Sequence, residues 1–337
     1  MKILVTGGAG YIGTHTCVEL IQSSHQIVVV DNLSNSKYEA IRRVEQITHT
    51  SIPFYQEDVR NYEAMKKIFE KENFDGIIHF AGLKCVPESV KIPLDYYQNN
   101  IDGTLVLLNL CKIYKVRNFV FSSSATVYGD PKILPIPEDA PLSATNPYGR
   151  TKLFIEYILK DFYLSDPFFN IAILRYFNPI GAHPSGLIGE DPNGIPNNLV
   201  PYVTQVAIKK LPYLKVNGND YPTKDGTGVR DYIHVCDLAR GHVLALEKLA
   251  TNCGLVIYNL GTGVGYSVLE VVNAFSKAVG FEIPYQIVER RPGDIATCYA
   301  DPKKAYEELH FKTQYDLTTM ANDAWNWQKK NPDGYDK

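Results

Sequence analysis

A glycine-rich turn between an apolar strand and a helix constrains this fold more than any other feature. Residues Ile3–Thr6 are predicted to form a buried strand, and the run GGAGYIG at positions 7–13 follows directly. Glycine permits the tight turn, Gly10 lets the backbone approach a pyrophosphate, and Gly13 lets the helix pack closely on the strand. The N–H groups at the start of that helix attract an anion. The turn therefore predicts a parallel α/β sheet with a dinucleotide at the ends of its strands.

Apolar runs and helical patterns alternate through the first half of the chain. The predicted strands are Ile3–Thr6, Ile27–Asp31, Ile52–Gln56, Gly76–Phe80, Asn118–Ser122 and Ile171–Tyr176. Helical patterns separate them, for example at Gly13–Gln22, Tyr62–Glu72 and Gly103–Tyr114. Strands separated by amphipathic helices form βαβ units of fixed handedness. A doubly wound parallel sheet is the simplest arrangement.

The pattern changes after Phe177. Residues 178–198 hold four prolines and four glycines, which predicts a functional loop, because loops longer than about 15 residues are otherwise uncommon. Helix and strand signals resume at Leu199–Lys210. The elements expected after that are a largely helical Asp231–Leu249, a strand at Val256–Leu260 and a helix at Ser267–Val279. We expect a dinucleotide-binding domain over residues 1–177, with segments near 231–262 returning to it. Residues 178–337 are expected to form a smaller, mixed α/β substrate domain.

Charge and composition exclude several classes of function. The 337-residue chain has a net charge of -3 and lacks a long basic run, so we expect no nucleic-acid partner. Its N-terminus does not read as a signal peptide, and no run of 18 apolar residues predicts a membrane span. The six cysteines are scattered, which indicates reduced thiols and no metal site. We expect a cytoplasmic protein.

Carboxylates and a lysine follow the next predicted strands. Asp31 lies 18 residues after Gly13, where a carboxylate accepts from a ribose 2′-hydroxyl and repels a 2′-phosphate. This position favours NAD over NADP. Asp58, after the third strand, can reach an adenine, but Asp is equally common in turns and helix caps. The run FAGLK at 80–84 allows close approach of a ligand and places Lys84 to meet its phosphate or ribose.

Tyr148 and Lys152 lie four residues apart in NPYGRTK, at positions 146–152. On a helix such residues share one face about 6 Å apart, and an ammonium favours a phenolate over a phenol of pKa about 10. The pair predicts a base acting on a hydroxyl, although the same spacing also occurs on ordinary helix surfaces. Three serines, 122–124, follow the fifth strand on the side where an open α/β sheet binds ligands. Ser124, the farthest along, is the candidate to bridge Tyr148 and a substrate.

These features together resemble the extended branch of the short-chain dehydrogenase/reductase superfamily. More narrowly, the chain is similar to UDP-galactose (UDP-glucose) 4-epimerases over nearly its whole length, from Met1 to near Trp327. The similar segments are FAGLK (80–84), SSSATVYG (122–129), NPYGRTK (146–152), RYFNPIGAHPSG (175–186), IPNNL (195–199), DGTGVRDYIHV (225–235) and ERRPGD (289–294). The fold implied is a Rossmann-type sheet.

The resemblance implies a retained NAD⁺ and inversion at C4 of a UDP-sugar. Tyr148 would take the proton of the 4-hydroxyl while hydride leaves C4, and a 4-keto sugar would turn and be reduced on its other face. Lys152 would keep Tyr148 ionised and bind the nicotinamide ribose, and Ser124 would bond the 4-oxygen or relay its proton. The implied cofactor-binding residues are Gly7, Gly10, Tyr11, Ile12, Gly13, Asp31, Asn32, Asn35, Ser36, Asp58, Val59, Phe80, Ala81, Gly82, Lys84, Asn99, Ser122, Tyr148, Lys152 and Phe177.

The resemblance also implies a sugar-nucleotide site and a homodimer. Arginines suit a diphosphate because the guanidinium binds it in a bidentate fashion. The dimer helices would lie near 100–114 and 149–163. The implied substrate-binding residues are Lys84, Ser124, Tyr148, Asn178, Asn198, Leu199, Lys215, Val216, Asn217, Arg230, Arg291, Asp294 and Cys298.

Cys298 matches the position that lines the sugar 2-substituent in this family. A tyrosine there is associated with rejection of N-acetyl sugars, whereas cysteine is small. We therefore expect the UDP-N-acetylglucosamine and UDP-N-acetylgalactosamine pair to interconvert as well. Alternatively, Cys298 is a small buried hydrophobe, and other residues decide.

The sequence supports three alternative functions less well. A sugar-nucleotide 4,6-dehydratase has an Asp-Glu pair after the strand-end threonine, whereas this chain reads Ser124-Ala125-Thr126. A uronate epimerase or decarboxylase needs an additional positive group at C6, and none can be placed. A non-catalytic dinucleotide sensor would not need the Tyr148 and Lys152 pair or a sugar-nucleotide site.

Overall fold

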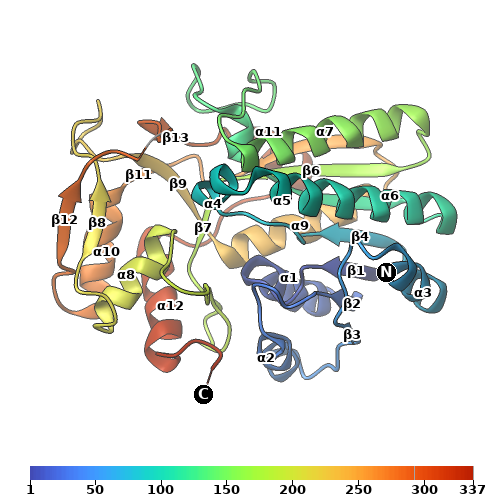
Figure 1. Cartoon of the computed structure of the whole chain (residues 1–337), viewed down its shortest axis with the longest axis horizontal. Coiled ribbons are helices and arrows are strands. Elements are labelled where there is room, and N and C mark those ends of the chain that lie inside the picture. Colours follow the sequence, from blue (N-terminus) through green and yellow to red (C-terminus); the bar gives the residue numbers. More distant parts are fainter. Residues whose placement is uncertain (292, 337) are drawn as a thin grey trace.

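The computed structural model describes residues 1–291 and 293–336 (Figure 1). Its first half alternates strands and helices. The elements of this half are β1 (Lys2–Thr6), α1 (Tyr11–Gln22), β2 (Gln26–Val30), α2 (Tyr38–Thr48), β3 (Phe54–Tyr55), α3 (Tyr62–Glu72), β4 (Gly76–His79), α4 (Val86–Lys91), α5 (Pro93–Tyr97), the π-helical turn η1 (Gln98–Asp102), α6 (Gly103–Tyr114), β5 (Asn118–Ser124), the 3₁₀ turn η2 (Ala125–Tyr128), α7 (Pro147–Ser165) and β6 (Asn170–Tyr176).

The second half begins with a short strand and a long loop. Its elements are β7 (Asn178–Ile180), α8 (Leu199–Ala207), β8 (Leu214–Asn217), β9 (Val229–His234), α9 (Val235–Leu249), β10 (Leu255–Leu260), β11 (Gly265–Ser267), α10 (Val268–Val279), β12 (Tyr285–Val288), β13 (Thr297–Cys298), α11 (Lys303–Leu309) and α12 (Leu317–Lys330).

A seven-stranded parallel sheet forms the centre of the larger body, in the order β10-β6-β5-β4-β1-β2-β3. The predicted doubly wound parallel sheet is therefore confirmed. Thr6 at the end of β1 is paired with Val30 of β2 and with His79 of β4. The strand order reverses between β1 and β4, and in such sheets ligands bind beyond the carboxyl ends of the strands at that point.

Alternate residues of each strand pack on opposite layers of helices. In β1, Ile3 and Val5 belong to a cluster with residues of α1, α2 and α9. Leu4 points the other way, into a cluster with α3, α6 and α7. Strands of a sheet covered on both faces are apolar throughout, which explains the continuous apolar runs in the sequence. Figure 1 shows the two helical layers, one on each side of the strands.

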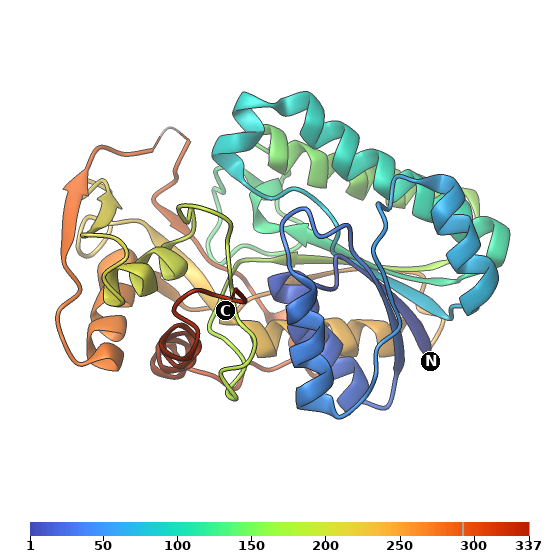
Figure 2. The same cartoon turned by 60° about the horizontal axis from the view of Figure 1, so that its bottom comes forward.

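The smaller body has its own core. Residues of α8, α10 and α12 pack around β8, where Val216 is buried, and around Tyr232 of β9. β9 pairs with β7 and β13 in parallel and with β11 antiparallel, while β8 pairs with β12. Figures 1 and 2 show this body beside the carboxyl ends of the large sheet. The chain enters it after β6, and β10 returns to the sheet next to β6.

Some predicted elements need correction. Asp231–Leu249 is largely helical as predicted, with α9 over Val235–Leu249, but its first four residues belong to β9. The predicted third strand shrinks to Phe54–Tyr55. Residues 178–180 of the predicted loop form β7, because they pair with β9. In the part of the chain that the structure describes, no helix is both long and apolar enough to cross a bilayer.

Candidate active site

The glycine turn after β1 is tightly packed. Gly7 has a φ of +70°, and a Cβ there would lie 2.6 Å from the backbone nitrogen of Ala81. A Cβ on Gly13 would lie 2.4 Å from the Gly7 carbonyl oxygen. Gly10 is the N-cap of α1, and because glycine has no side chain, it leaves the first N–H groups of the helix to a ligand. The turn has the shape that a pyrophosphate requires.

Asp31 organises the loop after β2. Its carboxylate accepts from the backbone N–H groups of Ala9 (3.0 Å) and Leu33 (2.9 Å) and from the Ser36 hydroxyl (2.8 Å). A carboxylate has about four acceptor positions, so one remains for a ribose hydroxyl. Asp31 thus joins the glycine turn to the segment that holds Asn32, Asn35 and Ser36.

Asp58 lies beside Asn32, whose side-chain amide donates to it at 3.3 Å. Two bonds from the Arg60 side chain, at 2.9 and 2.7 Å, lower the pKa of Asp58 to about 2. The neighbouring Val59 is buried. Asp58 also accepts from the backbone N–H of Arg60 at 2.9 Å, so it has the turn role that the sequence left open. Its Arg60 partner was not predicted.

The FAGLK segment is held by Asn100, a buried residue in η1. Its side-chain oxygen accepts from the N–H of Leu83 at 2.8 Å, and its amide donates to the Leu83 carbonyl and to the Thr151 hydroxyl, both at 3.0 Å. The predicted residue Asn99 donates to the same oxygen at 3.0 Å. A Cβ on Gly82 would lie 3.1 Å from this oxygen. Asn100 thereby connects this segment to α7.

The three serines after β5 have three different partners. Ser122 accepts from the phenol of Tyr176, and Ser123 donates to Glu156 at 2.6 Å. Ser124 ends the strand and caps η2, where its hydroxyl oxygen accepts from the backbone and the side chain of Thr126 at 3.2 and 3.0 Å. Its own proton remains to donate. Ser124, the candidate from the sequence, is thus the last residue of β5 rather than lying beyond the strand.

Tyr148 and Lys152 stand in the first two turns of α7. Asn146 caps this helix by accepting from the Gly149 N–H at 2.8 Å. Burial raises the pKa of the Tyr148 phenol, and interaction with the Ser124 hydroxyl acts in the opposite direction. Lys152 is 5% exposed, and its ammonium donates to the Ser122 carbonyl at 2.7 Å. Burial lowers the pKa of Lys152 to about 8, so at pH 7 it is still mostly charged.

Four of the predicted substrate residues lie in β9, in β13 and in the loop between β12 and β13. Arg230 in β9 is paired with Cys298 in β13. Cys298 is buried in a cluster that includes Ala125, Val127 and Phe177, so it packs against the turn that Ser124 caps. Arg291 lies 3.2 Å from the Asp294 carboxylate. The structure thus joins these two predicted residues as an ion pair.

The remaining predicted residues lie near the start of the second half. Asn178 opens β7, and Asn198 is the N-cap of α8, which Leu199 begins. The Asn198 amide donates to Glu190 at 2.9 Å, and Lys84 lies 3.4 Å from the same carboxylate. In β8, Lys215 is exposed, Asn217 is half-buried and the Val216 side chain points into the core. Val216 can therefore meet a ligand only through its backbone.

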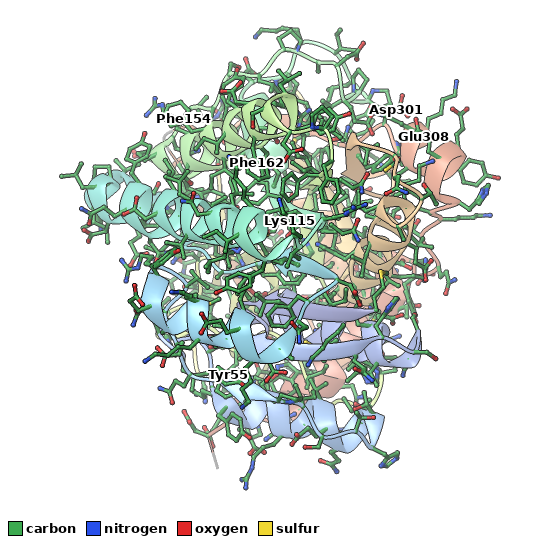
Figure 3. All side chains as sticks on the ribbon, turned by 90° about the vertical axis from the view of Figure 1, so that its right-hand side faces the viewer. Tyr55, Lys115, Phe154, Phe162, Asp301 and Glu308 are labelled. Atoms are coloured by element: carbon green, nitrogen blue, oxygen red, sulfur yellow. The ribbon has the colours of Figure 1, made fainter. Side chains whose placement is uncertain are left out.

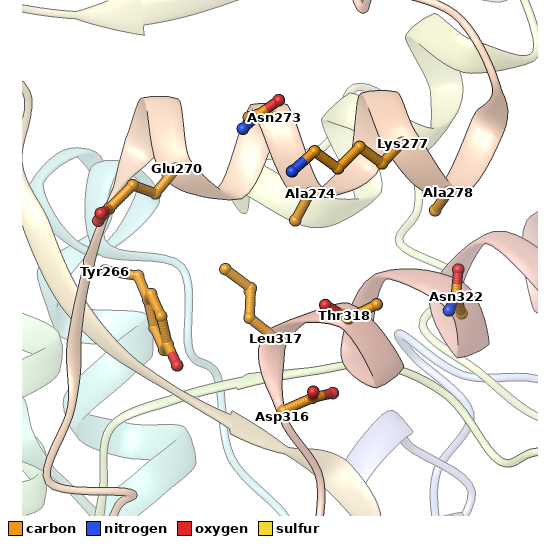
Figure 4. A pocket seen from close by; sticks show the side chains of 10 residues that line it. All are labelled: Tyr266, Glu270, Asn273, Ala274, Lys277, Ala278, Asp316, Leu317, Thr318 and Asn322. Atoms are coloured by element: carbon orange, nitrogen blue, oxygen red, sulfur yellow. The ribbon is translucent and has the colours of Figure 1, made fainter.

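Two hollows in the smaller body lie beside these elements. A cavity of about 440 Å³ is lined by α10, the start of α12 and Tyr266 of β11 (Figure 4). Another, of about 650 Å³, follows the ends of β8 and β12, from Gly218 to Asp220 and from Ile287 to Arg290. The second begins directly after Asn217, the last predicted substrate residue in β8.

Sequence reasoning missed residues whose roles depend on distant partners. Four of them contact predicted site residues or their immediate neighbours, and a fifth binds one of these four: Asn100, Arg60, Glu190 and Glu156, and Arg175, which pairs with Glu156. A charged residue in the apolar strand β6, Arg175, was a signal that sequence reasoning did not use, because a buried charge requires a partner.

Known proteins resemble this chain over its full length. A family model described as GDP-mannose 4,6 dehydratase matches residues 4–324. The UDP-glucose 4-epimerase of Bacillus subtilis (strain 168) is 61% identical over 335 residues, covering 99% of both chains. That of Dictyostelium discoideum is 62% identical, covering 99% of this chain and 97% of its own. A crystal structure of UDP-glucose 4-epimerase from Bifidobacterium longum in complex with NAD⁺ and UDP is 54% identical, has a TM-score of 0.96 and covers 99% of this chain and 100% of that chain.

Proposed function

The chain belongs to the family of the GDP-mannose 4,6 dehydratase model and, within it, to the UDP-glucose 4-epimerases, and we propose that Tyr148, Lys152 and Ser124 perform its chemistry. It is an NAD-dependent isomerase that interconverts UDP-galactose and UDP-glucose at C4. One observation carries the proposed assignment. Ser124 and Tyr148 interact beside a buried, charged Lys152, all at the carboxyl end of β5.

Each of the three side chains has a distinct task. Tyr148 removes the proton of the sugar 4-hydroxyl and later returns one to the 4-oxygen of the inverted sugar. Because burial raises its pKa, the phenolate needs a neighbouring positive charge, which Lys152 provides. The Ser124 hydroxyl donates a hydrogen bond to the 4-oxygen and keeps this oxygen in position throughout the reaction.

The first half of the chain fits NAD. The packing at Gly7 and Gly13 admits no side chain, which leaves backbone N–H groups to hold the pyrophosphate, and the Asp31 carboxylate would hold the adenosine ribose. The residues that would surround the adenosine are Asn32, Asn35, Ser36, Asp58 and Val59. The remaining cofactor contacts would come from Phe80–Gly82, Lys84, Asn99, Ser122 and Phe177. When bound, NAD⁺ supplies the hydride acceptor and donor. We assign this role to residues 1–177 and the returning segment near 231–262.

Residues of the second half would hold the UDP-sugar. Arg230 and Arg291 provide positive charge for the diphosphate, and Asp294 provides acceptors for the ribose hydroxyls. In this proposal the Arg291–Asp294 pair separates, so that each partner serves the nucleotide. The UDP-sugar site would be completed by Asn178, Asn198, Leu199 and residues 215–217. The assigned substrate part runs from 178 to 337, of which 292 and 337 lie outside the described residues.

The small side chain of Cys298 supports a second substrate pair. Cys298 belongs to the same buried cluster as Ala125 and Val127, which lie one and three residues after Ser124. A bulky residue at this position would extend toward the turn that Ser124 caps. We therefore include the UDP-N-acetylglucosamine and UDP-N-acetylgalactosamine pair among the substrates.

A homodimer through α6 and α7 is also part of the proposal. Exposed apolar residues gather on α6, at Leu105 and Ile113, and on α7, at Phe154, Tyr157 and Leu164. Phe154, labelled in Figure 3, stacks on Tyr97 with ring centroids 6.0 Å apart. Surface patches of large apolar residues on paired helices are typical of symmetric interfaces.

We also propose a cytoplasmic location. Within the described residues, the six cysteines are free thiols, the state that a reducing compartment maintains.

Proton NMR with UDP-galactose, then with UDP-N-acetylgalactosamine, tests the substrates. The expected products, without added NAD, are UDP-glucose and UDP-N-acetylglucosamine. UDP-glucose alone would remove the N-acetyl pair from the proposal. If neither product formed even with NAD supplied, another sugar nucleotide or a non-catalytic sensor would become the better explanation.

A further inference from the structure

Segment Gly181–Asp191, here called the strap, crosses from the smaller body to the cofactor half. Backbone carbonyls along the strap accept hydrogen bonds from side chains outside it, mostly from α12 and the residues after it. The donors are Asn326 to Pro184 (3.0 Å), Lys330 to Ser185 (2.9 Å), Asn331 to Gly186 (2.9 Å), Arg43 to Leu187 (3.1 Å) and Trp327 to Glu190 (3.2 Å). The path of the strap is thus set by distant residues near the C-terminus. Figure 2 shows α12, in dark red, beside this yellow-green segment.

The C-terminal residues close this arrangement. The Tyr335 hydroxyl accepts from the Gly189 N–H at 3.2 Å and donates to the Gly189 carbonyl at 3.3 Å. Asp191 accepts from the Tyr335 N–H at 3.0 Å and from Lys37 at 3.1 Å. A Cβ on Gly334 would lie 2.0 Å from the Asp191 carboxylate, so glycine permits this close approach.

A cation connects the C-terminal residues to α2. The Arg43 guanidinium lies 5.7 Å from the Trp327 ring centre and 5.0 Å from that of Tyr335. It also donates to Asn331 at 2.6 Å, and its side chain is nearly buried. The C-terminal residues therefore bind the strap and the cofactor half at the same time.

The strap and the residues after it also contact the assigned ligand site. The Tyr11 phenol, in the glycine turn, donates to the Gly181 carbonyl at 2.7 Å. Glu190 accepts from Asn198 and pairs with Lys84, and Asn193 donates to Asn35 at 3.3 Å. The strap thereby touches the pyrophosphate turn, and Asn193, two residues beyond it, touches the adenosine segment.

We propose that the strap retains the dinucleotide and that Tyr335 and Asp191 are positioning residues that hold it closed. The inference rests on the cofactor site proposed above and adds the device that controls release. Opening the strap requires loss of the Tyr335 bonds to Gly189 and of the Asp191 bonds to Tyr335 and Lys37. Removing these bonds speeds cofactor exchange and leaves the groups that do the chemistry in place.

Hydrogen exchange of the holoenzyme tests whether these bonds hold the strap. The variants are Tyr335→Phe, which keeps the ring on Arg43, and Asp191→Asn, which keeps an acceptor for the Tyr335 N–H. The matched control is Tyr306→Phe, whose side chain is exposed on α11. In both variants the amides of 183–191 are expected to exchange about five- to tenfold faster, because each variant weakens bonds that hold the strap, and in the control their exchange is unchanged. Unchanged protection in both variants would overturn the proposal.

Cofactor exchange tests retention. The holoenzyme is mixed with excess fluorescent 1,N⁶-etheno-NAD⁺, and uptake is followed over time. Both variants are expected to take it up about five- to tenfold faster than wild type, with kcat at saturating NAD⁺ unchanged. If the folded variants took up the analogue at the wild-type rate, the proposed role of the strap would be overturned, while the proposed function would stand. A wild-type protein that binds no dinucleotide would overturn the proposed function, and retention with it.

Discussion

Glu156 and Arg175 form a two-bond ion pair, at 2.9 and 2.7 Å, in which both side chains are buried. Glu156 continues the helical face of Tyr148 and Lys152, at intervals of four residues, and it accepts from Ser123, the neighbour of Ser124. The ion pair therefore fastens α7, which carries Tyr148 and Lys152, to β6, and the Ser123 bond to Glu156 fastens the same helix to β5.

Replacing Glu156 with Gln is expected to lower the free energy of unfolding by about 3–5 kcal/mol, because Arg175 would remain buried without its counter-charge. Urea titration measures this loss. The control is Glu70→Gln, which removes an exposed pair with Lys66 and should change stability by less than about 0.5 kcal/mol. Equal, small losses in both variants would show that the buried charge is not needed.

Tyr148→Phe is expected to lower kcat for UDP-galactose by about 10²- to 10⁴-fold, because the 4-hydroxyl loses its base. Steady-state kinetics and the NAD content of the purified protein provide the measurements. Tyr157→Phe, on the same helix but exposed, should keep full activity. Near-normal turnover in Tyr148→Phe would assign the proton transfer to another group.

Burial of Lys152 makes stability depend on pH. Its pKa falls from 10.5 in the unfolded chain to about 8 in the folded protein, so between these values the folded state binds fewer protons. Stability therefore rises with pH across this window. Relative to Lys152→Met, the wild-type protein should gain about 3 kcal/mol between pH 8 and pH 10.5, as measured by denaturant titration. If the difference in unfolding free energy between the two proteins did not change with pH, it would contradict a buried Lys152 ammonium.

Cys298→Tyr should abolish turnover of the N-acetyl pair and spare UDP-galactose and UDP-glucose. The larger ring would fill the space beside Ala125 and Val127 and exclude an acetamido group. Overpacking of a core costs about 1–3 kcal/mol, so thermal stability is measured in parallel. Turnover of UDP-galactose and UDP-glucose serves as the internal control. An equal loss of turnover for both substrate pairs would show that Cys298 does not select between them.

Phe154→Glu should shift the protein from dimer to monomer, because a charge would enter the proposed α6–α7 interface. Sedimentation velocity at several concentrations measures the change. Phe168→Glu, an equally exposed ring at 38% against 42%, lies beyond the end of α7 and should leave the dimer intact. A wild-type protein that sediments as a monomer would rule out the interface.

Local patterns predicted the parts of the site that lie close together in sequence. The glycine turn, Asp31 and the Tyr148 and Lys152 pair depend on one turn or one helix. The roles of the serines could not be predicted in the same way, since the partner of Ser122 lies 54 residues away and that of Ser123 33 residues away. The start of α9 could not be predicted either, since the strand character of Asp231–His234 comes from pairing with β7 and β11, which are distant in sequence.

The return of β10 to the large sheet affects how such a protein can be divided or recombined. A fragment ending at Phe177 would lack β10 and α9, so β6 would become an open edge and α1 would lose its cover. The specificity of this chain therefore cannot be exchanged by fusing one cofactor module to one sugar module at a single junction. A chimaera must replace two separate insertions, one before α9 and one after β10, while keeping the segment that passes between them.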